Sequence, residues 1–278
     1  MTAIATTKLP DGSSIPVFGL GTWGMGETRA RFDAEVAALR TGLDLGVSLI
    51  DTAEMYGNGG AERVVAEAIS GRRDAIYLVS KVLPSRAGPR LAIQACEDSL
   101  VRLETDHLDL YLLHWRGSVP LQETVRAFEE LKKAGKILRW GVSNFDAEDM
   151  HELDVAGSGC TANQVLYNLM RRGIEYDLLG DAQQRSVPIM AYSPIEQGRL
   201  AAHAALAGIA HAHGATPAQI ALAWVLDKPG VVAIPKSSHP DRVCENIKSL
   251  AVTLTDSDRA ALDKAFPPPR SKRPLEMI

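Results

Sequence analysis

Residues 47–56, VSLIDTAEMY, join a short apolar run to two ionisable side chains and decide the fold class of this chain. The run ends abruptly at the carboxylate of Asp51, and Tyr56 follows five positions later in a short polar turn. Two later apolar runs end in the same way, because YLVSK ends at Lys81 and LDLYLLH ends at His114. Buried parallel strands read as continuous apolar runs, so each run predicts a strand with an ionisable group at its carboxyl end.

Apolar runs of this kind alternate with longer segments of helical periodicity. The strand-like runs are VFGL, VSLI, IYLVS, LDLYLL, LRWGV, TANQVL, PIMAY and VVAIP, at residues 17–20, 47–50, 76–80, 108–113, 138–142, 161–166, 188–192 and 231–235. Helices are expected at residues 31–46, 89–103, 121–136, 216–226, 241–249 and 256–265. Such alternation is typical of parallel strands with helices on the outside.

Eight strands in this order indicate a (β/α)8 (TIM) barrel, whose usual size is about 250 residues. A doubly wound sheet is the alternative, but no GxGxxG motif follows a strand and opens a helix. The glycine-rich segment GLGTWGMG, at residues 19–26, lacks that spacing. We therefore predict an α/β protein with one barrel domain over residues 1–278.

Two additions to the barrel are expected at its ends. Residues 8–16, KLPDGSSIP, contain a turn core and predict an N-terminal β-hairpin that plugs the lower end of the barrel. Residues 241–249 and 256–265 form extra C-terminal helices after the last strand. The triple proline at residues 267–269 then predicts a tail that runs over the surface.

The composition excludes several classes of partner. Hydrophobic residues make up 46% of the chain and charged residues 23%, and the formal net charge of −4 argues against nucleic acid and anionic membranes as partners. The three cysteines, Cys96, Cys160 and Cys244, have no CxxC or Cys/His spacing, so neither a metal site nor a disulfide is predicted. Residues 1–14 lack the pattern of a signal peptide, and no apolar run approaches 18 residues. We expect a cytoplasmic protein.

The ionisable strand ends predict a proton-transfer site. Catalytic groups of a (β/α)8 barrel come from the carboxyl ends of different strands, where Asp51, Lys81 and His114 would meet. Tyr56, in the loop after Asp51, has a free pKa near ~10. A cation such as Lys81 would lower that pKa, with Asp51 keeping the lysine charged. His114 would then orient a carbonyl oxygen.

Each of these residues also has an ordinary structural interpretation. Asp51 can cap a loop, Lys81 can be a solvated strand end, and His114 can be a packed core histidine. Tyr56 alone would most often be a surface aromatic. Their occurrence together on consecutive strand ends would require four coincidences, so the shared catalytic site is favoured.

An ordered set of motifs identifies a family. The segments LIDTAEMYG, LVSK, LDLYLLHW, WGVSNF, NQVLYN, AYSPI and IPKS follow one another along nearly the whole chain. In this order they resemble the aldo-keto reductase superfamily, oxidoreductases in which one (β/α)8 domain binds NADPH and reduces aldehydes and ketones. The resemblance implies that Asp51, Tyr56, Lys81 and His114 are the catalytic tetrad, with Tyr56 as general acid.

The resemblance also implies an NADPH/NADP+ site along the barrel rim. Ser143, Asn144 and Gln164 would bond the nicotinamide carboxamide, and Tyr192 would stack on its ring. Lys and Arg side chains at a helix start suit a dianionic phosphate, which favours NADPH over NADH. The expected cofactor residues are Gly21, Thr22, Trp23, Asp51, Ser143, Asn144, Gln164, Tyr192, Ser193, Pro194, Ile234, Lys236, Ser237, Arg242, Glu245 and Asn246. Among them Ser193, with the segment after Pro194, would follow the pyrophosphate. Residues 234–246, IPKSSHPDRVCEN, would form the adenosine end, with Lys236, Ser237 and Arg242 at the 2′-phosphate and Glu245 and Asn246 at the adenine.

The substrate pocket is expected to be open. The loop after His114 is brief and the tail after Phe266 is short, and in the resembled family such segments wall the pocket. Trp23, Met55, Tyr56, His114 and Trp115 would line it. The resemblance is closest to small bacterial aldehyde reductases of the methylglyoxal reductase type, which implies a small carbonyl substrate and a monomer.

Three other functions stay open at this point. A redox-sensing regulatory protein of the same fold would hold NADPH with little turnover. A lyase would use Lys81 as a Schiff-base nucleophile. A metal hydrolase is disfavoured, since Asp51 and His114 lack further ligands on nearby strand ends.

Overall fold

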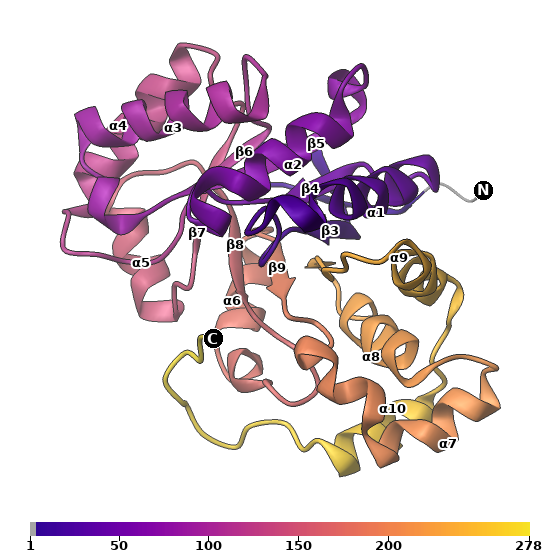
Figure 1. The fold of residues 1–278 in the computed structure, drawn as a ribbon. Helices are drawn as coiled ribbons and strands as arrows, with labels where there is room; N and C mark the ends of the chain where they lie inside the picture. Colours follow the sequence, from indigo (N-terminus) through magenta and orange to yellow (C-terminus); the bar gives the residue numbers. More distant parts are fainter. Residues whose placement is uncertain (1–3) are drawn as a thin grey trace.

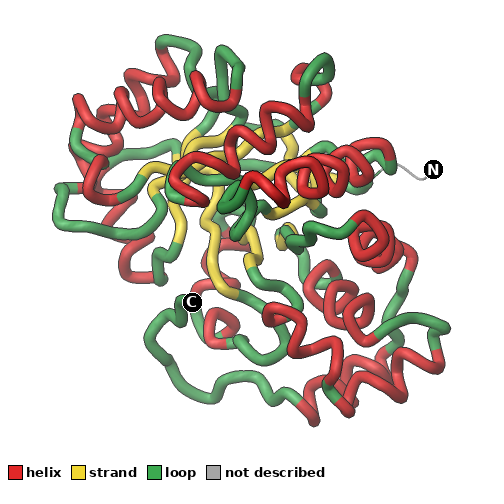
Figure 2. The backbone as a smooth tube through the Cα atoms, in the orientation of Figure 1, coloured by secondary structure: helices red, strands yellow, loops and turns green. Residues whose placement is uncertain are grey.

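The structure, a computed structural model, describes residues 4–278. Residues 1–3, part of the segment expected to carry no signal peptide, lie outside the described residues. Eight parallel strands occupy the centre and are enclosed by helices (Figure 2). They are β3 (Gly19–Gly21), β4 (Leu49–Asp51), β5 (Tyr77–Val82), β6 (Leu110–Leu113), β7 (Trp140–Ser143), β8 (Cys160–Leu166), β9 (Ile189–Tyr192) and β10 (Val231–Ala233). Every predicted strand is present, so the sequence located the sheet correctly.

The strands pair in chain order from β3 to β10, and the barrel closes between these two strands. The closing seam is irregular, since it consists of two isolated parallel bridges, Phe18 with Ala233 and Gly21 with Lys236. Gly21 N donates to Pro235 O at 3.0 Å across it. The predicted (β/α)8 barrel is confirmed.

Helices surround the strands (Figure 1). They are α1 (Phe32–Asp44), α2 (Gly60–Ile69), α3 (Pro89–Leu103), α4 (Leu121–Lys133), α5 (Ala147–Ala156), α6 (Leu178–Gln184), α7 (Ala204–Ala212), α8 (Pro217–Leu226), α9 (Pro240–Ile247) and α10 (Asp256–Ala265). Short 3-10 turns are η1 (Arg29–Arg31), η2 (Tyr56–Gly59), η3 (Arg73–Ala75), η4 (Pro84–Arg86), η5 (Gly173–Glu175), η6 (Glu196–Ala202) and η7 (Lys248–Ala251). The periodicity predicted α1, α3, α4, α8, α9 and α10 but did not single out α2, α5, α6 or α7.

The N-terminal hairpin closes the lower end of the barrel. Strands β1 (Thr6–Lys8) and β2 (Ser14–Pro16) pair antiparallel. Leu9 and Ile15 are buried and pack in one cluster with inward side chains of the barrel, among them Leu49, Leu110 and Met190. The predicted plug is therefore confirmed, and it leaves only the carboxyl ends of the strands open for a site.

The tail after α10 has no regular structure and is mostly exposed, as the prolines predict. It returns from α10 toward the middle of the molecule, where the C-terminus lies (Figure 1). Among the helices of residues 4–278, none has the length and apolar character needed to cross a bilayer.

Candidate active site

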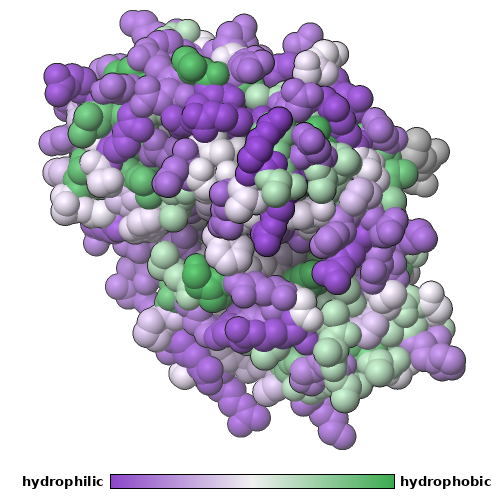
Figure 3. All heavy atoms as spheres, viewed as in Figure 1, coloured by the Kyte–Doolittle hydropathy of each residue, from purple (hydrophilic) through white to green (hydrophobic). Residues whose placement is uncertain are grey.

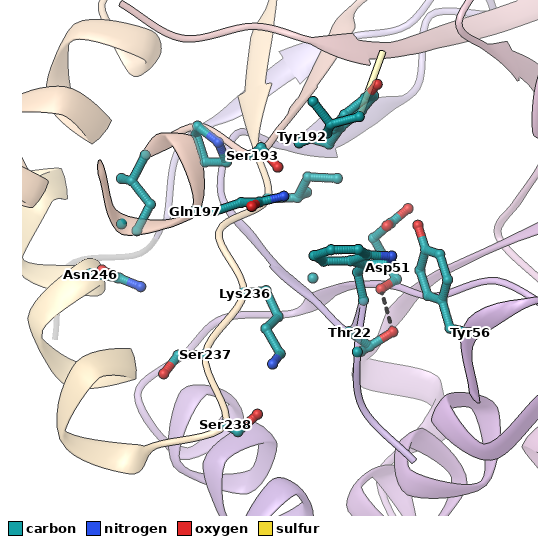
Figure 4. A pocket seen from close by; sticks show the side chains of 18 of the residues that line it. Thr22, Asp51, Tyr56, Tyr192, Ser193, Gln197, Lys236, Ser237, Ser238 and Asn246 are labelled. Carbon is teal, nitrogen blue, oxygen red and sulfur yellow. Dashed lines mark hydrogen bonds between the residues drawn. The ribbon is translucent and has the colours of Figure 1, made fainter. Parts of the chain in front are cut away.

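A cavity of about 1190 Å³ lies at the carboxyl ends of the barrel strands. The space-filling view shows the molecule hollowed near the middle of this face (Figure 3). Asp51 and Tyr56 lie at one end of the cavity and Asn246 and Ser237 at the other (Figure 4). Its length therefore suits an extended ligand with two different ends.

The predicted residues converge on this cavity. Every residue expected to contact cofactor or substrate lines it, and so do three of the four catalytic candidates. The fourth, Lys81, is fully buried below the floor beside Asp51. The lining includes Gly21, Thr22, Trp23, Asp51, Met55, Tyr56, His114, Trp115, Ser143, Asn144, Gln164, Tyr192, Ser193, Pro194, Ile234, Lys236, Ser237, Arg242, Glu245 and Asn246.

Lys81 is the centre of the floor. It ends the inward row of β5, and its Nζ donates to Asp51 Oδ2 at 2.8 Å, to Thr52 O at 2.8 Å and to Tyr56 OH at 3.3 Å. An ammonium has three donors, so all of them are used. Burial alone would lower the pKa of Lys81, but Asp51 and Tyr56 raise it above its ordinary value. The lysine therefore stays charged.

Asp51 is held from three directions. Its second carboxylate oxygen, Oδ1, accepts from Gln164 Nε2 at 2.7 Å. Its backbone carbonyl accepts from Thr22 Oγ1 at 3.0 Å, the bond drawn in Figure 4. A buried ion pair is tolerated where the remaining lone pairs and protons are satisfied, and these contacts meet that condition.

Tyr56 begins η2 and leans over Lys81, whose Nζ lies 4.8 Å from the centre of the phenol ring. The turn behind it needs Gly57, which has a φ of 55° and would place a Cβ 2.8 Å from Met25 O. Burial raises the pKa of Tyr56 above its ordinary value, and Lys81 offsets only part of this rise. Lys81 lowers the pKa of Tyr56 as the sequence predicted, but burial, together with the charge of Asp51, outweighs the cation and the net pKa is raised. The phenol keeps its proton at neutral pH.

His114 follows β6 and packs against two aromatic rings. Its ring centre lies 5.8 Å from that of Tyr56, edge to face, and 4.9 Å from that of Trp115. Burial, with the nearby charge of Lys81, lowers the pKa of His114 to about 3, so the imidazole is neutral. Its Nδ1 is buried and has no hydrogen-bond partner among residues 4–278. The tautomer with its N–H at Nε2 leaves no buried donor unpaired.

A polar wall continues from this floor along the ends of β7, β8 and β9. Ser143 Oγ donates to Gln164 O at 2.8 Å, Asn144 Nδ2 donates to His114 O at 3.1 Å, and Tyr192 OH donates to Asn144 Oδ1 at 3.0 Å. Gln164 Oε1 accepts no hydrogen bond from residues 4–278, although Gln164 lines the cavity. The wall thus offers a prebuilt acceptor that fits the amide group of a nicotinamide.

Two cationic side chains line the cavity toward its opposite end. Lys236 follows β10, and Arg242 projects from the first turns of α9. Within the described chain neither side chain forms an ion pair, so both remain available to an anion. Burial lowers the pKa of Lys236, with Glu35 opposing part of the effect. A phosphate group fits two such cations beside a helix start.

Several lining residues were not predicted from the sequence. Met277 and Ile278, the last residues of the chain, lie against the cavity with Tyr192. The tail is short, as expected, but its end walls one side that was expected to be open. Trp23 and Met55 remain 55% and 40% exposed, so the mouth stays accessible. Further unpredicted residues are Gly24, Glu27, Arg31, Ala34, Glu35, Ala201 and Ala218. Ile195, Gln197 and Gly198 belong to the segment after Pro194 that was expected along the pyrophosphate, and Ser238 and His239 belong to the segment expected at the adenosine end.

Neither helical periodicity nor a motif in the sequence pointed to the unpredicted residues. The tail lacks periodicity, and its distance along the chain from Tyr192 hides the contact. Glycine spacing is the one available signal, because the segment at residues 19–26 contains Gly24 and precedes Glu27. That signal marks a loop and not a ligand contact.

Comparison with known proteins agrees with this geometry. Residues 17–266 match the model of the aldo/keto reductase family. Escherichia coli (strain K12) methylglyoxal reductase YeaE is 54% identical over 95% of this chain and 96% of its own. Glyoxal reductase of Bacillus subtilis (strain 168) is 34% identical over 93% of this chain and 91% of its own.

A solved relative has the same architecture. The aldo/keto reductase from Klebsiella pneumoniae in complex with NADP and acetate superposes with a TM-score of 0.96, at 52% identity, over 99% of this chain and 100% of its own. The family model and these relatives cover almost the whole of the chain. The chain belongs to the aldo/keto reductase family.

Proposed function

We propose that the chain is an NADPH-dependent reductase of small aldehydes and ketones, with Tyr56 as the general acid. The observation that carries this proposal is the position of Lys81, whose ammonium donates to both Asp51 and Tyr56 beneath the cavity. A protonated phenol next to a fixed cation can give up a proton, because the cation stabilises the phenolate that forms.

The residues that would hold the cofactor follow from the two ends of the cavity. Gln164, Ser143 and Asn144 face the amide end, while Lys236 and Arg242 face the phosphate end. NADPH, when bound, supplies the hydride for the carbonyl carbon. The complexes of the Klebsiella pneumoniae relative with NADP and NADPH support this assignment, given 52% identity to this chain.

The chain's own residues account for the proton. His114, neutral and with its N–H at Nε2, donates a hydrogen bond to the carbonyl oxygen and orients it. Tyr56 transfers its hydroxyl proton to the same oxygen as the hydride arrives, which leaves a phenolate. Lys81 stabilises that phenolate, and water returns the proton. In the reverse direction the phenolate accepts a proton from an alcohol.

The proposed substrates are small carbonyls of the methylglyoxal type. The reacting end is lined by Trp23, Met55 and Trp115, which give apolar contacts without a recognition element for a particular polar group. Apolar pockets of this kind discriminate weakly among substrates. The methylglyoxal reductase name of the Escherichia coli relative supports the substrate class. We further propose that residues 1–278 act as one domain, as a monomer in the cytoplasm.

The geometry weighs against the lyase alternative. A Schiff-base lysine must be an uncharged nucleophile with a free lone pair. Lys81 is held as a cation, and its three protons are engaged by Asp51, Thr52 and Tyr56. We therefore expect borohydride to trap no covalent adduct between an aldehyde and the protein when NADPH is absent.

The test of the proposal is NADPH oxidation by the purified protein with methylglyoxal and with a nitrobenzaldehyde. Steady turnover of both is expected, and it should disappear in Tyr56→Phe. Tight NADPH binding with negligible oxidation of any aldehyde would contradict the proposal and favour a redox-sensing regulator. Borohydride trapping without NADPH would favour the lyase.

A further inference from the structure

Arg171 connects two walls of the cavity that are far apart in the sequence. It lies in the turn after β8, and its guanidinium donates to Glu196 Oε1 through Nε at 3.1 Å and through one terminal nitrogen at 2.9 Å. Its other terminal nitrogen donates to Glu276 Oε1 at 2.6 Å. One side chain therefore holds an acidic residue from η6 and another from the tail.

The first wall is the segment that leads into η6. Ser193, Glu196 and Gln197 have φ values of 47°, 48° and 54°, a region that residues other than glycine seldom adopt. Such backbone persists only where the surroundings fix it. Asn168, fully buried, provides part of this restraint, because its Nδ2 donates to Ser193 O at 2.9 Å and to Glu196 Oε2 at 2.8 Å. Arg171 provides the rest.

Glu196 points away from the cavity while its neighbours face it. Its side chain is 4% exposed, whereas Ile195, Gln197 and Gly198 line the cavity. A buried carboxylate needs a paired cation, and Arg171 is the nearest one, since Arg199 approaches only to 3.8 Å. Without Arg171 this negative charge would keep only the longer contact to Arg199, beside the segment proposed to follow the cofactor pyrophosphate.

The second wall is the end of the tail. Lys272 anchors the tail further back through an ion pair with Glu148. Beyond it, Glu276 is the last residue with an ion pair to the barrel, and Met277 and Ile278 line the cavity directly after it. Figure 1 shows the tail returning to the centre of the molecule at this point. The Arg171–Glu276 pair therefore sets where the substrate-side wall ends.

We propose that Arg171 is a positioning residue that fixes the cofactor-facing segment and the substrate-facing end of the tail relative to each other. The inference rests on the proposed function in assigning one wall to NADPH and the other to the carbonyl. Arg171 contacts neither ligand and acts through Glu196 and Glu276. Affinity for both ligands thus depends on one cation that lies outside the cavity lining.

Four variants separate the contact of Arg171 with Glu196 from its contact with Glu276. Arg171→Ala is expected to raise both the KM for the aldehyde and the Kd for NADPH by about three- to tenfold, with kcat changed by less than about twofold. Glu276→Gln should raise only the aldehyde KM. Arg171→Lys keeps a positive charge beside Glu196 but cannot bind Glu276 at the same time, as the guanidinium does. Compared with Arg171→Ala, it should restore NADPH affinity and leave the aldehyde KM raised. The double variant Arg171→Ala with Glu196→Gln should also restore NADPH affinity and leave the aldehyde KM raised, because it removes the buried negative charge of Glu196.

The matched control is Arg40→Ala, which removes an exposed arginine paired with Glu67 away from the cavity. It should change neither constant. A purely structural role for Arg171 predicts a lower Tm with both constants unchanged, and that result would overturn the proposal. The same applies if the double variant fails to recover NADPH affinity.

Amide hydrogen exchange distinguishes this proposal from the proposed function. Arg171→Ala should speed exchange at residues 193–198 and at residues 276–278, whereas Glu276→Gln should speed it only at residues 276–278. Unchanged exchange in both segments would overturn the positioning role even in an active enzyme. Faster exchange in a protein without aldehyde turnover would support the positioning role and reject the proposed function alone.

Discussion

Gln164 and Lys81 each donate a hydrogen bond to a different oxygen of the Asp51 carboxylate. Gln164 Nε2 donates to Oδ1 at 2.7 Å, and Lys81 Nζ donates to Oδ2 at 2.8 Å. With one strong donor on each oxygen, the carboxylate is fixed in position. We infer that Asp51 acts by keeping Lys81 charged and in place beneath Tyr56, and that it transfers no proton to the substrate.

Loss of the lysine charge should cost stability as well as activity. Lys81→Met leaves the carboxylate of Asp51 buried without its cation, so we expect a fall of about 3–5 kcal/mol in the free energy of unfolding. Lys81→Met combined with Asp51→Asn should recover part of this loss and no activity. Urea denaturation measures the first effect, and Arg40→Met, at an exposed ion pair, should cost less than about 1 kcal/mol. Equal costs for Lys81→Met and Arg40→Met would contradict the buried pair.

Removal of the phenol hydroxyl should separate chemistry from binding. Tyr56→Phe deletes the proposed proton donor while retaining the ring, and a positioned acid contributes about 10²–10⁴-fold to a rate. We expect kcat to fall within that range and the Kd for NADPH to stay within about twofold. The control is Tyr176→Phe, because Tyr176 is 51% exposed and outside the cavity lining. Full activity in Tyr56→Phe would rule out the assignment of the proton donor.

The buried neutral His114 should make the protein less stable in acid. Its pKa of about 3 in the folded protein lies below the ordinary histidine value of 6.5. Between these values the unfolded chain binds a proton that the folded chain excludes, so stability falls as the pH falls through this window. One such group contributes at most about 1.4 kcal/mol per pH unit.

The measurement compares the free energy of unfolding of the unaltered protein and of His114→Gln at several pH values below 6.5. The unaltered protein should lose stability more steeply, since glutamine binds no proton. Identical slopes would mean that His114 titrates in the folded protein as it does in the unfolded chain. The dependence of turnover on pH should show no loss of activity near pH 6.5 from protonation of His114.

Arg242 should distinguish NADPH from NADH. A hydrogen bond to a charged group contributes about 1.5–3 kcal/mol, so Arg242→Ala should weaken NADPH by about ten- to a hundredfold. NADH, which lacks the 2′-phosphate, should be weakened by no more than about twofold. Fluorescence titration with each cofactor gives the two Kd values. Lys248→Ala serves as the control, because Lys248 is exposed and directly follows α9. Equal losses for the two cofactors would place the phosphate elsewhere.

The strands were predictable because each is buried on both faces and therefore reads as an apolar run. The ionisable ends at Asp51, Lys81 and His114 stood out for the same reason, since Asp109 is the only other charged residue in those three runs. Helix α8 was also predictable from the sequence, because Thr216 and Gln219 form the capping box that begins it. These features depend on neighbours in the chain.

Features that depend on distant segments were not predictable. The pKa of Tyr56 is decided by a competition between burial and Lys81, and the sequence shows the cation but not the depth of the ring. Arg171 and Glu276 lie far apart in the chain, so their pairing left no local pattern. The end of the tail was expected to leave the pocket open, whereas an ion pair brings Met277 and Ile278 to its side.

We infer that a bound cofactor would assist closure of the irregular seam between β3 and β10. Phe18, directly before β3, forms a bridge with Ala233 of β10, so the sheet cannot close until almost the whole chain has been synthesised. Closing so long a loop costs conformational entropy, and two isolated bridges provide little stabilisation to offset that cost. Gly21, on one side of the seam, and Ile234, on the other, both face the cavity. A dinucleotide that contacts both sides of the seam would therefore stabilise the closed barrel.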